Sequence, residues 1–420
     1  MIASEQYKTE QKAKANKEVI TKIQKTKPIL IDMGIVGEVV PHFQHNMILT
    51  SGAPLPWEDY EGGQKEAIIY GAIFEGLAEN REEAVKKIKT KEILIAPCHD
   101  YSCIGSVTGI YTASMPVFIV EDANTGVRAY CNLFEGEIHE KLTYGLYNDK
   151  TKRNLHFLRR VVTPILQQAI KTSGGINLLE IIRRAINMGD ELHSRNTAAS
   201  LLFTRELTPY LLDLYKESPE NTRATLQYLE NDYNFLRLGM AASKALSDSC
   251  SKTEHSSIVT AMAFSCKEFA IRVSGTGNQW FRAPLPTGQV RLFEGYSEKD
   301  VAWLGGESSI TETMGLGGFV QAAALTLQDY SGGTPEKMID NNKRMYEITL
   351  DEHSVYKLPI FEFRGAPIGI DIFKVVEKGI TPVINMGVAH KEGGQIGAGV
   401  VNAPLKCFED AVNAYNQRYR

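Results

Sequence analysis

The sequence predicts an α+β protein with two α/β domains and a small all-helical domain between them. Strand-like and helix-like stretches alternate in the first part of the chain, helical spacing of apolar residues then dominates, and strands return near the end. At 420 residues the chain is also too long for one ordinary core. We therefore expect an N-terminal α/β domain over 1–150, a helical domain over 151–250 and a C-terminal α/β domain with Gly-rich loops over 251–420.

In the first part, a polar, lysine-rich helical arm precedes the short buried strand PILIDMG (28–34). Apolar residues at helical spacing and β-branched runs then predict the order helix, helix, strand, strand. Asn80 stands where the second of these helices needs an N-cap. The four elements are expected at 61–78, 80–90, 92–97 and 115–122.

The middle part carries apolar residues three and four apart almost throughout, which predicts helices. Pro164 and Pro209 should kink or interrupt them, because proline lacks the backbone N–H that a helix uses. The predicted helices cover 156–172, 176–215, 221–231 and 235–250.

The last part returns to strands at 256–264, 268–275 and 289–293, followed by a Gly-rich stretch. The pattern beyond it predicts a helix, a strand, a short helix, a strand and a final amphipathic helix. These are expected at 334–352, 361–372, 372–379, 381–387 and from about Pro404.

Composition excludes several classes of protein. The net charge of −4 leaves no basic surplus for nucleic acid, and no apolar run is long enough to span a membrane. The N-terminus lacks the apolar core of a signal peptide. The six cysteines show no CxxC spacing, so we expect reduced thiols and a cytoplasmic protein.

The stretch INMGVAHKEGGQIGAGVV (384–401) reads as an apolar strand, a Gly-rich turn and the start of a helix. Backbone N–H groups in such a turn bind anions, and His390 and Lys391 would suit a phosphate or carboxylate. The spacing of Gly394 and Gly397 fits neither a P-loop nor a dinucleotide-binding loop. The alternative is a tight turn whose glycines only supply positive φ.

The segment NMGDELHSRNTAAS (187–200) is unusually polar between apolar flanks. On a helix, Asp190 would meet His193, and Glu191 would meet Arg195. The alternative is a surface ion pair beside a helical histidine. A metal site is not expected, because one Asp-x-x-His supplies only two ligands.

Two further stretches offer single candidates. In APCHDYSCIGSVTGIYTASMP (96–116), Cys98 and His99 are adjacent and cannot easily form a nucleophile pair, so His99 is a ligand donor at the end of a strand. In AIRVSGTGNQWFRAP (270–284), Arg272 and Arg282 can each clamp an anion, unless they only flank a hairpin on the surface.

A second Gly-rich turn, GESSITETMGLGG (306–318), contains two glutamates. Glu307 and Glu312 there are expected to orient an arginine or to act as a base. No GxSxG or HExxH signature accompanies them.

These stretches, with RAYCNLFEG, SIVTAM and GIDIFKVVEKGITPVINMG, resemble the bacterial YlbE/YahG (AllG-like) family from about residue 17 to 410. The resemblance implies a subunit of an oxamate carbamoyltransferase in anaerobic allantoin and purine catabolism. That enzyme converts oxalurate and phosphate to oxamate and carbamoyl phosphate, and it acts with an FdrA-like subunit and a third small subunit. The alternative is a non-catalytic scaffold or small-anion-binding subunit of a CoA-ligase-like complex.

All ligands of that reaction are small anions, so the residues above become hypotheses for the site. We expect no metal and no cofactor, and a homodimer from the base rate of symmetric assemblies. The candidate catalytic residues are His99, His193, Arg195 and Glu312. The candidate ligand-binding residues are Arg272 for the oxamate carboxylate, His390, Lys391, Gly394 and Gly397 for the phosphate, and Asn278, Arg282 and Asn385.

Overall fold

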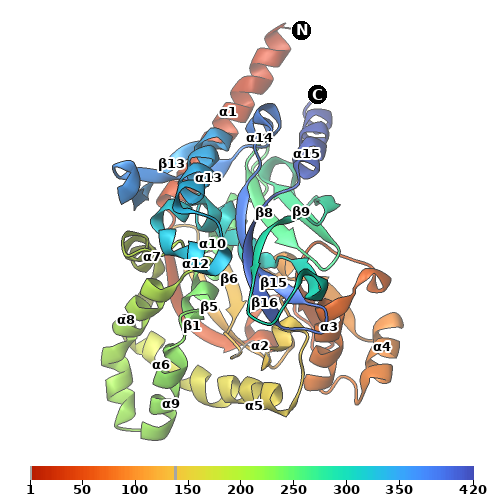
Figure 1. Ribbon diagram of the computed structural model, residues 1–420, viewed down its shortest axis with the longest axis vertical. Coiled ribbons are helices and arrows are strands. Elements are labelled where there is room, and N and C mark those ends of the chain that lie inside the picture. Colours follow the sequence, from red (N-terminus) through yellow and green to blue (C-terminus); the bar gives the residue numbers. More distant parts are fainter. Residues whose placement is uncertain (1, 137–139) are drawn as a thin grey trace.

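The structure, a computed structural model, describes residues 2–136 and 140–420 and has the α+β class that the sequence predicts. Both termini lie at the same end of the molecule, where the long helix α1 and the last helix α15 project (Figure 1). Helices α6, α8 and α9 gather at the opposite end, and α3 and α4 lie along one side.

The strands form several separate sheets. The largest has the order β4-β6-β5-β1-β7 and pairs antiparallel except for β4 with β6. A three-stranded sheet has the order β10-β9-β8 and a four-stranded sheet the order β11-β16-β15-β12, both antiparallel. Two pairs complete the set, β13 with β14 and β2 with β3. The strand bounds are β1 Pro28–Ile35, β2 Met47–Thr50, β3 Leu94–Pro97, β4 Cys103–Ile104, β5 Pro116–Asp122, β6 Arg128–Asn132, β7 Ile176–Asn177, β8 Val259–Phe264, β9 Glu268–Val273, β10 Phe281–Pro284, β11 Gly288–Leu292, β12 Val301–Leu304, β13 Thr349–Leu358, β14 Arg364–Ile370, β15 Val383–His390 and β16 Gln395–Asn402.

The helices agree with the predicted order in the first two parts of the chain. Asn80 caps α4 as expected, because its side chain accepts a hydrogen bond from the Glu83 N–H at 3.0 Å. A π-helical turn (Leu158–Val162) interrupts the predicted α-helix just before Pro164, whereas α8 runs through Pro209 without a break. The helix bounds are α1 Ile2–Lys25, α2 Val36–Val39, α3 Gly62–Phe74, α4 Arg81–Lys89, α5 Asp149–Phe157, α6 Thr163–Ser173, α7 Leu178–Asn187, α8 Thr197–Tyr215, α9 Pro219–Leu229, α10 Asn234–Cys250, α11 Ile310–Thr313, α12 Gln328–Ser331, α13 Pro335–Ile348, α14 Ile372–Lys378 and α15 Leu405–Arg418.

Helix α10 is the buried centre of the molecule. It packs on β5 and β6 of the large sheet, and also contacts α1, α11 and β8. The largest hydrophobic core joins the sheet, the helices α6 to α10 and residues beyond 310. Strand β7, from the middle part of the chain, pairs with β1. The division into three domains therefore stays a prediction.

Three predicted elements are wrong. The helix expected over 176–215 is broken by a loop at 188–196, because Gly189 and Leu192 have positive φ values of 97° and 68°. The helix expected to 352 ends at Ile348, where the chain enters β13.

The helix expected after the Gly-rich turn is a strand, β16, which pairs with β15 and β11. Its glycines allow close packing, since a Cβ added at Gly397 would lie 2.5 Å from the carbonyl oxygen of Arg291 on β11. The backbone of β16 therefore pairs within a sheet, and its N–H groups do not form an open turn for an anion.

We expect Gly318→Ala to lower the free energy of unfolding by about 1–3 kcal/mol, because the added Cβ would collide with the carbonyl oxygen of Val383 on β15. The control is Gly239→Ala in α10, whose Cβ would meet only the Leu192 oxygen at 3.9 Å. That change should be neutral or stabilise by up to about 1 kcal/mol. Urea unfolding of both variants checks this, and equal stabilities would contradict the close approach at Gly318.

Candidate functional site

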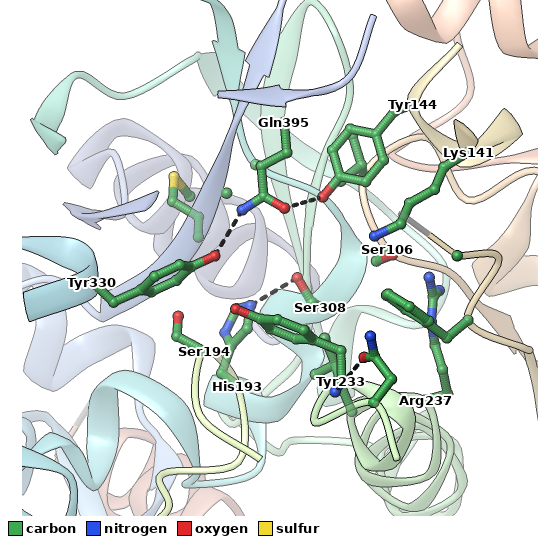
Figure 2. A pocket seen from close by; sticks show the side chains of 18 of the residues that line it. Ser106, Lys141, Tyr144, His193, Ser194, Tyr233, Arg237, Ser308, Tyr330 and Gln395 are labelled. Atoms are coloured by element: carbon green, nitrogen blue, oxygen red, sulfur yellow. Dashed lines mark hydrogen bonds between the residues drawn. The ribbon is translucent and has the colours of Figure 1, made fainter. Parts of the chain in front are cut away.

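A pocket of about 220 Å³ lies where the loop between α7 and α8, the start of α10 and the hairpin β15–β16 meet. We call it the main pocket. Polar groups enter it from segments far apart in the sequence (Figure 2). The residues that line it are Ser106, Val107, Phe134, Gly136, Lys141, Tyr144, His193, Ser194, Asn231, Tyr233, Leu236, Arg237, Phe293, Gly305, Ser308, Tyr330, Met386, Gly387 and Gln395.

His193 reaches the pocket from the loop 188–196. The buried carboxylate of Glu191 shapes this loop, accepting hydrogen bonds from the backbone N–H groups of His193, Ser194 and Arg195. Asp190 accepts from the Ala199 N–H at 2.8 Å near the start of α8. Asp190 and His193 therefore do not pair as neighbours on a helix, and the turned loop presents the imidazole instead.

The imidazole of His193 lies between a carboxylate and a hydroxyl. Its Nδ1 is 2.7 Å from Oε1 and 2.9 Å from Oε2 of Glu312, and its Nε2 is 2.8 Å from Oγ of Ser308. Glu312 also accepts hydrogen bonds from the Thr311 hydroxyl at 2.9 Å and from the Gly318 and Asn385 N–H groups at 3.0 Å each. A carboxylate with these donors is held as an acceptor, so Nδ1 of His193 carries the proton that it shares with Glu312.

The charge of Glu312 governs the protonation of His193. Burial alone would lower the pKa of His193, but the Glu312 carboxylate and its hydrogen bond raise it above its ordinary value. A histidine in this position can accept and return a proton near neutral pH.

Two buried cations give the pocket a positive side. The ammonium of Lys141 lies 4.0 Å from the ring centre of Phe134, and the guanidinium of Arg237 donates to Oδ1 of Asn132 at 2.9 Å. Arg237 is only 2% exposed, and its Nε has no hydrogen-bond partner among the described residues. The neighbouring Glu135 is buried, which raises the pKa of its carboxyl against the opposing effect of Arg237. An anion in the pocket could accept a hydrogen bond from the Nε of Arg237.

Hydroxyls and an amide also line the pocket, with Tyr144 on the side of Lys141, whose ammonium lies 5.5 Å from the centre of the Tyr144 ring. Gln395 donates to the Tyr330 hydroxyl at 3.0 Å and accepts from the Tyr144 hydroxyl at 2.8 Å. Burial raises the pKa of both tyrosines, so both hydroxyls stay protonated. The Tyr144 proton is already donated to Gln395, whereas Tyr330 only accepts from Gln395 and can donate its own proton to a ligand. Figure 2 shows Lys141 and Arg237 on one side, Tyr330 on the other, and His193 and Ser308 between them.

A second pocket, of about 230 Å³, contains three of the predicted residues, His99, Arg272 and Asn278. Arg272 pairs with Asp100 at 2.5 Å and lies over the ring of Trp280. On the other side of this pocket, the Lys244 ammonium of α10 donates a hydrogen bond to the Asp248 carboxylate. This polar hollow is separate from the main pocket, so the structure does not bring Arg272 and His193 to one site.

Glu307 lies beside both pockets. Its carboxyl accepts from the Gly52 and Gly105 N–H groups at 3.1 Å each and lies 3.6 Å from Nε2 of His99. Burial raises the pKa of Glu307 to about 8, and burial followed by the charges of Lys244 and Arg272 lowers that of His99 well below its ordinary range. Near neutral pH both groups are therefore mainly uncharged.

Comparison with known proteins assigns the chain to a family. A family model described as oxamate carbamoyltransferase subunit AllG matches residues 93–308. The Escherichia coli (strain K12) protein of that name is 38% identical over 408 residues, which are 96% of this chain and 97% of the relative. The chain belongs to the AllG family.

Other relatives are as similar in sequence and fold. The uncharacterized protein YahG of E. coli (strain K12) is 38% identical over 410 residues, covering 97% of this chain and 86% of YahG. The crystal structure of a conserved protein of unknown function from Enterococcus faecalis V583 superimposes with a TM-score of 0.94. It is 35% identical, with 98% of this chain and 99% of that chain covered.

Three predicted residues of this AllG-family chain lie outside both pockets and have other partners. Arg195 donates to the Gly189 carbonyl at 3.0 Å, and Arg282 pairs with Glu268 at 2.7 Å. Asn385 is buried, and its backbone N–H holds Glu312. Through that contact Asn385 supports the main pocket without lining it.

The Gly-rich stretch also contributes less directly than expected. His390 packs against Tyr296, and the Lys391 N–H donates to the Asp300 carbonyl. The Gly394 N–H donates to the carbonyl of Tyr144, and Gly397 pairs within the sheet. Gln395, between them, reaches the main pocket, and so do Met386 and Gly387 at the beginning of the stretch.

Sequence reasoning missed most of the pocket lining. Ser308 had one usable signal, because it follows Gly305 and Gly306 between a strand and a short helix, a turn that exposes a side chain. No comparable pattern marks the others. They are Lys141, Tyr144, Tyr233, Arg237, Tyr330 and Gln395.

Residues 2–136 and 140–420 contain no group of three or more His, Cys, Asp or Glu side chains placed to hold a metal ion. Within those same ranges no helix is long and apolar enough to cross a membrane. All six cysteines are buried and carry free thiols.

Replacing Glu312 by glutamine should lower the pKa of His193, because the negative charge that favours imidazolium disappears while the burial remains. An NMR titration of the His193 ring in wild type and Glu312→Gln measures the change. The exposed Glu377→Gln serves as the matched control and should leave the midpoint in place. An unchanged midpoint in Glu312→Gln would mean that Glu312 does not set the protonation of His193.

Proposed function

We propose that this chain is the substrate-binding and catalytic subunit of an oxamate carbamoyltransferase, with its site in the main pocket. The reaction moves a carbamoyl group from oxalurate to phosphate, giving oxamate and carbamoyl phosphate. The relative named as a subunit of oxamate carbamoyltransferase supports the assignment to this class. The supporting observation within the chain is a histidine poised for proton transfer beside two buried cations.

The charges of the pocket fit the reactants. Oxamate, oxalurate, phosphate and carbamoyl phosphate are all small anions, and Lys141 and Arg237 offer them charge-assisted hydrogen bonds. The carbamoyl group itself is neutral and needs only hydrogen-bond donors around its oxygen, such as the Tyr330 hydroxyl. Because both cations are buried, their attraction for an anion is weakly screened by water and salt.

The reaction also needs a proton at the nitrogen of departing oxamate. His193 is placed to supply it, since Nε2 faces Ser308 at the pocket wall and Glu312 stabilises the imidazolium that forms on the way. The roles predicted for His193 and Glu312 thus remain part of the proposal. Those of His99, Arg272 and Asn278 belong to the second pocket, which needs its own test.

We further propose that the chain acts with an FdrA-like subunit and a third small subunit, and that it forms a homodimer. Purified chain, alone and combined with those subunits, should be tested for phosphate-dependent release of carbamoyl phosphate from oxalurate. Release that requires phosphate supports the proposal. No release from the complete assembly would contradict it and favour a scaffold or anion-binding subunit.

Lys141→Met should raise the KM for phosphate about tenfold or more, because a charged hydrogen bond contributes about 1.5–3 kcal/mol. Methionine keeps most of the length of the side chain and removes the ammonium that lies over the Phe134 ring. The exposed Lys299→Met is the control for loss of one positive charge. Steady-state kinetics of the assembled enzyme measure both variants, and equal KM values would remove Lys141 from the anion site.

A further inference from the structure

Ser308 is the one hydroxyl that the described structure hydrogen-bonds to Nε2 of His193. The order is hydroxyl, imidazole, carboxylate, with 2.8 Å from Oγ of Ser308 to Nε2 and 2.7 Å from Nδ1 to Glu312. Since Nδ1 carries the shared proton, Nε2 is the acceptor for the Ser308 hydroxyl. This is the arrangement that activates serine as a nucleophile, and it is recognised by geometry on unrelated folds.

The backbone around Ser308 is built to present this hydroxyl. Gly305 and Gly306, both with a φ of 142°, follow strand β12, and the short helix that carries Ser308 comes directly after them. A Cβ added at Gly306 would lie 2.5 Å from the backbone nitrogen of Val107. Val107 itself, a β-branched residue, has a φ of 51° at the pocket wall. Such costly conformations are typical of functional sites.

Glu312 is fixed as firmly as the hydroxyl. Its carboxylate accepts from two backbone N–H groups, on Gly318 and Asn385, and from the Thr311 hydroxyl as well as from His193. A structural hydrogen-bond chain would also be satisfied in this way. The position of these groups favours a catalytic role over a purely structural one, because Ser308 and His193 both line the cavity next to Lys141 and Arg237 (Figure 2).

We propose that Ser308 is the nucleophile of the carbamoyl transfer and carries the carbamoyl group as an ester between two displacements. The proposal rests on the function proposed above. It also explains why one small pocket with one cationic side serves two anions. Oxamate and phosphate would use Lys141 and Arg237 in turn, without both having to fit at once.

In the first displacement, Oγ of Ser308 bonds to the ureido carbonyl carbon of oxalurate while His193 Nε2 takes the hydroxyl proton. The bond from that carbon to the oxamate nitrogen then breaks, and His193 returns the proton to this nitrogen as oxamate leaves. In the second, a phosphate oxygen bonds to the carbamoyl carbon and the ester bond to Ser308 breaks. The proton of the attacking phosphate passes through His193 to Oγ, and no oxidation or reduction occurs.

The test is isotope exchange in the assembled enzyme without phosphate. Two displacements predict that labelled oxamate enters oxalurate, because the carbamoyl group waits on the enzyme. Mass spectrometry of enzyme mixed with oxalurate should find one added carbamoyl group on the peptide containing Ser308. Ser308→Ala should lose the exchange and the adduct, with its folding checked by thermal unfolding.

The matched control is Ser354→Ala, since Ser354 is exposed and lies outside both pockets. This variant should keep the adduct on Ser308. Glu312→Gln, which leaves the nucleophile in place, should slow the exchange and move its pH profile to lower pH. A merely structural Ser308 predicts neither the adduct nor the exchange.

Three outcomes overturn the inference, and they are distinguishable. If exchange and adduct are absent while the same enzyme makes carbamoyl phosphate, phosphate attacks oxalurate directly and only the proposed function stands. If carbamoyl phosphate is also absent, the proposed function fails together with the inference. Full exchange by Ser308→Ala would likewise exclude this serine as the carrier.

Discussion

The hydrogen bonds to the buried Glu312 carboxylate are the constraint on which the site depends. Through them α11, the Gly-rich turn at Gly317 and Gly318, strand β15 and the loop that carries His193 converge on one group. A buried charge is tolerated only when such partners surround it. If one partner is removed, the desolvation of the charge is no longer fully compensated. The same bonds that satisfy Glu312 therefore also fix the imidazole.

Helix α10 provides the second organising feature. It runs through the centre of the molecule and carries Arg237 and Lys244 about two helical turns apart, one facing each pocket. Neither cation is more than 2% exposed. A rigid, buried helix holds both at fixed positions, so each pocket has its charge in place before a ligand arrives.

The turn after β12 lies between the two pockets. Glu307 lies against His99 of the second pocket, and the next residue, Ser308, faces His193 of the main one. Burial leaves Glu307 and His99 mainly uncharged near neutral pH. The negative charge of Glu312, in contrast, favours the protonated form of His193 and raises its pKa. The strong acid–base contrast therefore concentrates in the main pocket, which is where we place the chemistry.

The sequence by itself determined the α+β class, most of the long helices, about half of the strands, the Asn80 cap and the family resemblance, because periodicity and capping are local properties. It also pointed to His193 and Glu312 as separate candidates. Local patterns failed at the loop 188–196, where positive φ at Gly189 and Leu192 breaks a helical pattern, and at β16, where glycines pack against a neighbouring strand. Only the tertiary structure joined Ser308, His193 and Glu312 and sent Arg272 to another pocket, because contacts between distant segments are set by packing around α10 and not by sequence spacing.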